Sequence, residues 1–301
     1  MKKQLFFQSA VVSTILSYFL IFVGGLVRVS GAGMGCPNWP KCGDGWMPPT
    51  NIDINQINTT LAWIEFTNRM FGIILGISII ILNVLAVFYF RKNYNLLFAS
   101  ILSLIFVIVN GVLGGVLVWF ELNPYIKTVH MLFALILVSI LSYICIKSYK
   151  MINTTLFKGL KKNPILSKSL IVFWILIVVE ILLGTGIRTN LELVSIENPL
   201  LSKGELLNAL DSYKYFHSFL GFTLFFLSAY IYSKLRTNKL YIARFLGIFI
   251  LGMIVVQIFL GEMMIFFELP QLTRLFHTWG SSWLVGVVII LYNCISNEYD
   301  K

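Results

Sequence analysis

Two eleven-residue stretches of this sequence begin with Phe-Glu-Leu and end with histidine: FELNPYIKTVH at 120–130 and FELPQLTRLFH at 267–277. The only other histidine among the 301 residues is His217. Two neutral imidazoles on facing helices of a bundle can hold a haem iron from both faces, whereas a closed zinc site needs four ligands. His217 and His277 are therefore predicted to be the axial ligands of a haem b. The alternative is that both are polar residues wetted at helix ends.

The two stretches belong to a longer internal repeat. A shift of 147 residues aligns Asn110 with Gln257, Gly114 with Gly261, Phe120 with Phe267 and His130 with His277; a shift of 149 aligns Asn68 with His217 and Gly72 with Gly221. The first helix of each half ends in a similar motif, GGLVR at 24–28 and GTGIR at 184–188. This order indicates a tandem repeat of four helices. Each half then has two histidine slots, and the first half fills one of them with Asn68.

The elements that carry these residues are predicted from hydropathy. Of the residues, 58% are hydrophobic and only 12% are charged, and the mean hydropathy is +0.85, so the chain is predicted to be an all-α integral membrane protein. Eight apolar stretches are long enough to span a bilayer, near 8–29, 66–90, 96–119, 126–147, 169–188, 213–234, 241–266 and 274–294. They are expected to form two tandem four-helix bundles: residues 1–150, a cytoplasmic linker at 151–168, and residues 169–301.

The basic residues predict the orientation of the chain. Fifteen of the 23 Lys and Arg residues fall on the side that carries both termini, which places both termini in the cytoplasm. The net charge of +10 is explained by this topology and indicates no nucleic-acid binding. The first apolar run is too long for a typical signal peptide, and Arg28 interrupts it, so it is predicted to be a retained helix.

The first half carries a different set of polar residues from the second. Glu65, Asn68 and Arg69 are spaced to lie on one face of a helix, and His130 is expected opposite them. A haem held by His130 alone would keep one face of its iron open, unless Asn68 or a water occupied it. An open iron position beside a carboxylate suits oxygen or redox chemistry. A Glu65–Arg69 salt bridge is a second interpretation, and both can hold.

Further residues are candidates for supporting roles. Basic residues on the outer side could bind haem propionates or snorkel to the interface: Arg28, Arg188, Arg274 and Lys127, besides Arg69. Cys36 and Cys42 could form a disulfide, either structural or redox-active. Glu180 and Glu262 are carboxylates inside apolar stretches, suited to bonding a haem substituent, relaying protons or forming a buried pair.

These residues resemble those of the haem A synthases of aerobic respiratory membranes, over almost the whole chain. RVSGAGMGCPNWPKC is similar to that family's first outer loop, and EFTNR at 65–69 is similar to its Glu-x-x-His-Arg motif, with Asn68 in place of the histidine. The resemblance implies that Glu65 is catalytic, that His130 lines the substrate haem site, and that His217 and His277 hold a permanent haem b. A second outer-loop cysteine pair, which some members of that family carry, is absent here.

The resemblance also implies a reaction and partners. The substrate would be haem O, delivered by a haem O synthase, and its C8 methyl would be oxidised to a formyl group in the plasma membrane. The electron-transfer partner is not identified by the sequence, and a homo-oligomer is compatible with it. The alternatives are a haem b electron carrier, or a haem-handling assembly factor without catalysis.

Overall fold

The computed structural model is built from helices. It describes residues 2–43, 45–48, 58–157, 163–208, 210 and 212–296, and within these ranges no strand is present. Eight helices are long and apolar enough to cross a membrane: α1 (Lys2–Ser30), α2 (Thr59–Phe90), α3 (Tyr94–Trp119), α4 (Pro124–Ile152), α6 (Pro164–Glu197), α8 (Tyr213–Leu235), α9 (Tyr241–Phe266) and α10 (Gln271–Ser296). The prediction of an all-α protein with eight spanning helices is confirmed.

Several of these helices are longer than hydropathy predicted, α2 and α6 among them. Helix α2 begins at Thr59 rather than near residue 66, because Asn58 caps it by accepting a hydrogen bond from the Leu61 main-chain N–H. Helix α6 runs to Glu197 rather than 188. A hydropathy window stops at the first polar residues, but ion pairs between residues four apart stabilise the polar turns beyond it.

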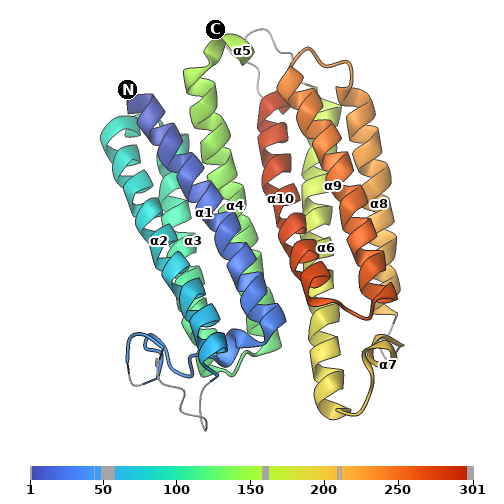
Figure 1. The fold of residues 1–301 in the computed structure, drawn as a ribbon. Helices are drawn as coiled ribbons and strands as arrows, with labels where there is room; N and C mark the ends of the chain where they lie inside the picture. Colours follow the sequence, from blue (N-terminus) through green and yellow to red (C-terminus); the bar gives the residue numbers. More distant parts are fainter. Residues whose placement is uncertain are drawn as a thin grey trace. The chain divides into compact units, whose positions relative to one another are not determined.

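The chain divides into two compact units, residues 1–149 and 150–301. In the first unit, α2 packs against both α1 and α3; Phe106 contacts Phe133 between α3 and α4, and Phe7 contacts Tyr149 between α1 and α4. In the second unit, α6 and α9 each pack against both α8 and α10 (Figure 1). Each unit thus has four long helices side by side. The predicted linker contains α5 (Thr154–Phe157), while its Lys158, Lys161 and Lys162, like the terminal Lys301, lie outside the described residues.

The repeated Phe-Glu-Leu motif forms the turn between the third and fourth long helix of each unit. Glu121 and Leu122 have φ angles of 47° and 62°, and Glu268 and Leu269 have φ angles of 52° and 63°. The leucine N–H bonds back into the preceding helix in both turns, to the carbonyl of Leu117 in one and of Met264 in the other, each at 2.8 Å. The motif therefore places a histidine on the second turn of α4 and of α10 by the same backbone path.

Short elements lie beside these turns. The 3₁₀ helix η1 (Ala32–Met34) packs near the first turn, since a Cβ added to Gly33 would lie 2.8 Å from Leu122 Cδ1. Helix α7 (Lys203–Asn208) follows Ser202, whose main-chain N–H and hydroxyl both donate to the Glu205 carboxylate. These donors hold the pKa of Glu205 below its ordinary value.

Candidate functional site

The two histidines of the second unit face each other. His217 lies on the second turn of α8 and His277 on the second turn of α10, and their ring centroids are 6.4 Å apart. Glycines make room for both rings. A Cβ added to Gly184 of α6 would lie 3.2 Å from His217 Cε1, and one added to Gly261 of α9 would lie 3.8 Å from His277 Cε1. Both imidazoles thus lie against glycine backbone.

The spacing of the two rings fits a shared metal. With metal–nitrogen bonds of about 2.0 Å and about 1.2 Å from each nitrogen to its ring centre, two axial imidazoles have centroids roughly 6 Å apart. The observed 6.4 Å agrees with this. The angle of 65° between the ring planes is compatible as well, because each imidazole can turn independently about a common axis. Across the described residues, no cluster of three or more His, Cys, Asp or Glu could hold a metal ion by itself.

Cationic groups lie near this pair. Arg274, one turn before His277 on α10, has a buried Nε with no hydrogen-bond partner in the part of the chain that the structure describes. Arg188 pairs with Glu192, its Nε lying 3.2 Å from Glu192 Oε1, and Glu192 also attracts Arg274 electrostatically. The buried, unbonded Arg274 Nε is the kind of donor that a carboxylate such as a haem propionate would satisfy.

The corresponding slots in the first unit hold Asn68 and His130. Asn68 Oδ1 lies 3.5 Å from a Cβ added to Gly24 of α1, and His130 Cε1 lies 3.9 Å from one added to Gly114 of α3. Asn68 Oδ1 and His130 Nδ1 are both buried and lack a hydrogen-bond partner within the described ranges. These contacts match those of His217 with Gly184 and His277 with Gly261, so both units build their slots in the same way. The difference is the missing imidazole at position 68.

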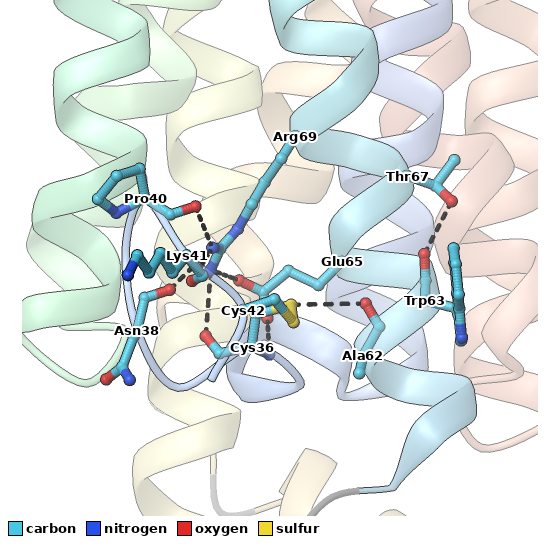
Figure 2. Close-up of a disulfide and its surroundings, with 10 residues drawn as sticks. All are labelled: Cys36, Asn38, Pro40, Lys41, Cys42, Ala62, Trp63, Glu65, Thr67 and Arg69. Atoms are coloured by element: carbon cyan, nitrogen blue, oxygen red, sulfur yellow. Dashed lines mark hydrogen bonds and ion pairs between the residues drawn. A yellow bond between two sulfur atoms is a disulfide. The ribbon is translucent and has the colours of Figure 1, made fainter. Parts of the chain in front are cut away.

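Glu65 is buried near the N-terminal end of α2 and bonds to the loop that follows η1. One carboxylate oxygen accepts a hydrogen bond of 2.9 Å from the Cys36 main-chain N–H, and the other accepts one of 2.5 Å from Arg69 Nη2 (Figure 2). The Glu65 side chain is only 6% exposed. The salt bridge that the spacing suggested is therefore present, and both oxygens of the predicted catalytic carboxylate have donors.

Arg69 contacts the loop through its main-chain carbonyls. Its guanidinium donates to the carbonyl oxygens of Cys36, Asn38 and Lys41 at 3.1, 2.8 and 3.0 Å, in addition to Glu65 (Figure 2). Four of the five guanidinium N–H groups have acceptors in this arrangement if each bond uses its own hydrogen. Arg69 thus fixes the loop to α2, which leaves little capacity for a propionate.

The loop is closed by a disulfide between Cys36 and Cys42. Both cysteines are buried against Ala62 of α2, with Cys36 Sγ 3.6 Å from the Ala62 carbonyl oxygen. Gly35 makes this packing possible, because a Cβ there would lie 2.5 Å from the Leu61 main-chain carbon. The other side of the loop reaches α3, where the Trp39 indole would lie 2.8 Å from a Cβ on Gly115. The disulfide loop therefore covers the ends of α2 and α3.

The remaining predicted cations lie at helix ends. Arg28 lies in the last turn of α1, and Lys127 lies in the first turn of α4, both partly buried. Glu262 lies on the exposed side of α9. Glu180 differs from it, since Glu180 Oε1 lies 3.1 Å from His217 Nδ1. The sequence does not identify this partner of Glu180, because His217 lies on another helix.

One residue was missed as a site candidate, although the repeat had aligned it. Gln257 of α9 is 8% exposed, and neither polar atom of its amide has a hydrogen-bond partner among the described residues. Gly280 of α10 lies directly beside it, since a Cβ there would lie 2.3 Å from Gln257 Nε2. The sequence feature that could have identified Gln257 is an amide within an apolar stretch, one helical turn before Gly261.

These features define a class: a multi-pass helical membrane protein with facing histidines at one end of a bundle. A profile of the family described as cytochrome oxidase assembly protein matches residues 8–289, so the chain belongs to that family. Curated relatives named heme A synthase include those of Geobacillus thermodenitrificans (31% identical over 130 residues), Geobacillus kaustophilus (28% over 131) and Listeria monocytogenes (28% over 133). The aligned segments cover 43–44% of this chain and 38–41% of those relatives.

Proposed function

We propose that this protein is a haem A synthase, which oxidises the C8 methyl of haem O to a formyl group for terminal oxidase assembly. Family membership and the names of the curated relatives support an oxidoreductase acting on haem O. The observation that carries the proposal is the pair of imidazoles in the second unit, whose 6.4 Å spacing suits a haem b iron. The second unit would hold this cofactor, and the first would take the substrate.

In the second unit, His217 and His277 would be the axial ligands of haem b, and Arg274 would bind a propionate. A bound haem b supplies one-electron redox chemistry. The protein's part would be to supply two imidazoles that leave no iron position open to other ligands. A closed iron favours electron transfer over reaction with small molecules. Arg188 would be a second propionate partner, although its Nε is already paired with Glu192.

In the first unit, His130 would orient the substrate haem O from one face. Asn68, in the slot opposite, would leave the other face open or close it only weakly through its amide. Arg28 and Lys127, basic residues at the helix ends of this unit, would bind propionates, whereas Arg69 is engaged by the disulfide loop. Oxidation of a methyl to a formyl group removes protons as well as electrons. A carboxylate near the methyl would accept the protons, while the electrons would leave through the haem b of the second unit.

Glu65 would be that carboxylate. It would have to exchange the Cys36 N–H or Arg69 for the substrate or a water during turnover. The disulfide loop, which supplies the Cys36 N–H, would therefore control when the carboxylate acts. This loop would then have a structural role, which is supported by its packing over α2 and by the Cys36 N–H that it places beside Glu65.

The alternative is a haem b electron carrier or haem-handling assembly factor without catalysis. Two observations favour it: Asn68 replaces an imidazole in the first unit, and both Glu65 oxygens are already bonded. The two functions differ in what Glu65 does. If the protein is the enzyme, the Glu65→Gln variant keeps the low-spin haem b spectrum and forms no haem A. If the protein is a carrier, Glu65→Gln leaves its electron transfer unchanged. Glu262→Gln, which removes an exposed carboxylate of α9, is the matched control.

The surroundings of the protein follow from the same proposal. It would lie in the plasma membrane with both termini in the cytoplasm, because basic residues concentrate on that side. A haem O synthase would supply the substrate within the lipid phase. The electron acceptor would reach the haem b of the second unit, and homo-oligomers are compatible with this arrangement.

A further inference from the structure

Glu180 is a carboxylate within a long apolar run of α6, IVFWILIVVEILLG. Its side chain is 16% exposed, and its Oε2 is buried without a hydrogen-bond partner among the described residues. Ionisable groups in spanning helices are costly, and they are kept where they have a partner or a function. The contacts of Glu180 identify that partner.

The carboxylate lies directly behind the His217 ring. Glu180 Oε1 is 3.1 Å from His217 Nδ1, within hydrogen-bonding distance, although the ring N–H is not aligned with the oxygen for a linear bond. Gly221 of α8 allows this approach, since a Cβ there would lie 3.4 Å from the same oxygen. With Nδ1 beside Glu180, Nε2 is the nitrogen left for a metal.

The internal repeat provides a comparison within one chain. Aligning GTGIR at 184–188 with GGLVR at 24–28 makes Leu20 the equivalent of Glu180 in the first unit. The equivalents of His217 and Gly221 are Asn68 and Gly72. The unit that lacks the histidine also lacks the carboxylate, and a Cβ on Gly72 would meet nothing within 4 Å. Glu180 and His217 are thus present together in one unit and replaced together in the other. This joint occurrence indicates that the carboxylate is present to contact the histidine, and that the helix does not need it for its own stability.

We propose that Glu180 is a positioning residue for the haem b ligand His217, an inference that rests on the proposed haem b site. The carboxylate accepts the Nδ1–H of His217, which fixes the tautomer that presents the Nε2 lone pair and holds the ring in one orientation. A carboxylate behind a ligating imidazole also makes it a stronger electron donor to the metal. The iron is then held more tightly, and its oxidised form is favoured.

The test compares Glu180→Gln and Glu180→Leu with the full-length wild type in detergent. Leucine reproduces the residue of the first unit and removes the acceptor, whereas glutamine keeps an acceptor oxygen without the charge. The rate at which haem b transfers to a haem-scavenging protein is measured, together with its midpoint potential. Loss of such a partner typically weakens metal binding about 10–100-fold, so Glu180→Leu should release haem faster by this order and raise the potential. Glu180→Gln should lie between it and the wild type, and Glu262→Gln should match the wild type.

Two results would overturn the inference, and they are distinguishable. If both Glu180 variants retain haem and potential like the wild type, while His217→Ala loses the low-spin spectrum, then Glu180 has no positioning role and the haem site stands. If His217→Ala and His277→Ala keep that spectrum, the proposed haem b site itself is wrong and the role of Glu180 falls with it. Should Glu180→Leu fail to fold, the nearly isosteric Glu180→Gln still decides the question by its release rate and potential.

Discussion

Removing the Arg69 guanidinium should loosen the disulfide loop from α2. Arg69→Met keeps most of the apolar stem but deletes the hydrogen bonds to three loop carbonyls and the ion pair with Glu65. The side chains of Arg69 and Glu65 are 13% and 6% exposed, so the pair is shielded from solvent. Removing one partner of a buried pair costs about 3–5 kcal/mol, and 3 kcal/mol corresponds to roughly a 100-fold change in the opening equilibrium of the loop.

The assay is the rate at which a water-soluble phosphine reduces the Cys36–Cys42 bond, followed by alkylation and mass spectrometry. Both sulfurs are buried, so reduction requires the loop to open. If the loop opens and closes faster than the phosphine reacts, the rate of reduction follows the opening equilibrium and should rise roughly 100-fold. Arg69→Lys should lie between, because one ammonium cannot reach all the acceptors of the guanidinium. Thr67→Ala, an exposed change on α2, is the control. A wild-type reduction rate in Arg69→Met would refute the claim that this guanidinium holds the loop.

Three further substitutions test the packing of the slots and the loop. Gly184→Ala puts a methyl 3.2 Å from His217 Cε1 and should shift or weaken the low-spin haem b spectrum, whereas Gly72→Ala, with nothing within 4 Å, should leave it unchanged; equal spectra would contradict the close contact. Gly35→Ala meets α2 backbone at 2.5 Å, so it should speed disulfide reduction; a wild-type rate would show that the loop does not pack there. Asn68→His restores the second imidazole of the first unit and should add a second low-spin haem signal, with reduced carbon monoxide binding at that site. An unchanged spectrum with unchanged carbon monoxide binding would contradict the slot assigned to Asn68.

Much of the fold follows from periodicity and hydropathy. Eight spanning helices are evident in the sequence because crossing a bilayer requires long apolar runs. The internal repeat aligns His130 with His277 and Asn68 with His217 from the sequence alone. In the structure these four residues make matching contacts with glycines of neighbouring helices. The spacing of Glu65 and Arg69 also foretold their ion pair, since residues four apart on a helix are neighbours.

The contacts between distant segments could not be predicted. The Cys36 N–H reaches Glu65 across 29 residues, and Glu180 meets His217 on another helix, because helix rotation and loop path decide both. Hydropathy also stopped α6 at residue 188, although the Arg188–Glu192 pair carries it further. A sequence shows which polar residues need partners, whereas the packing of the bundle determines which partners they find.

The most direct test of the central claim is mass analysis of haems extracted from membranes of a host that lacks haem A. The host expresses this chain together with a haem O synthase. The account predicts haem A, or its hydroxylated precursor, in the wild-type extract, and with Glu65→Gln haem B and unmodified haem O without haem A. A wild-type extract that contains only haem B and unmodified haem O, from protein that is folded and haem-loaded, would contradict it.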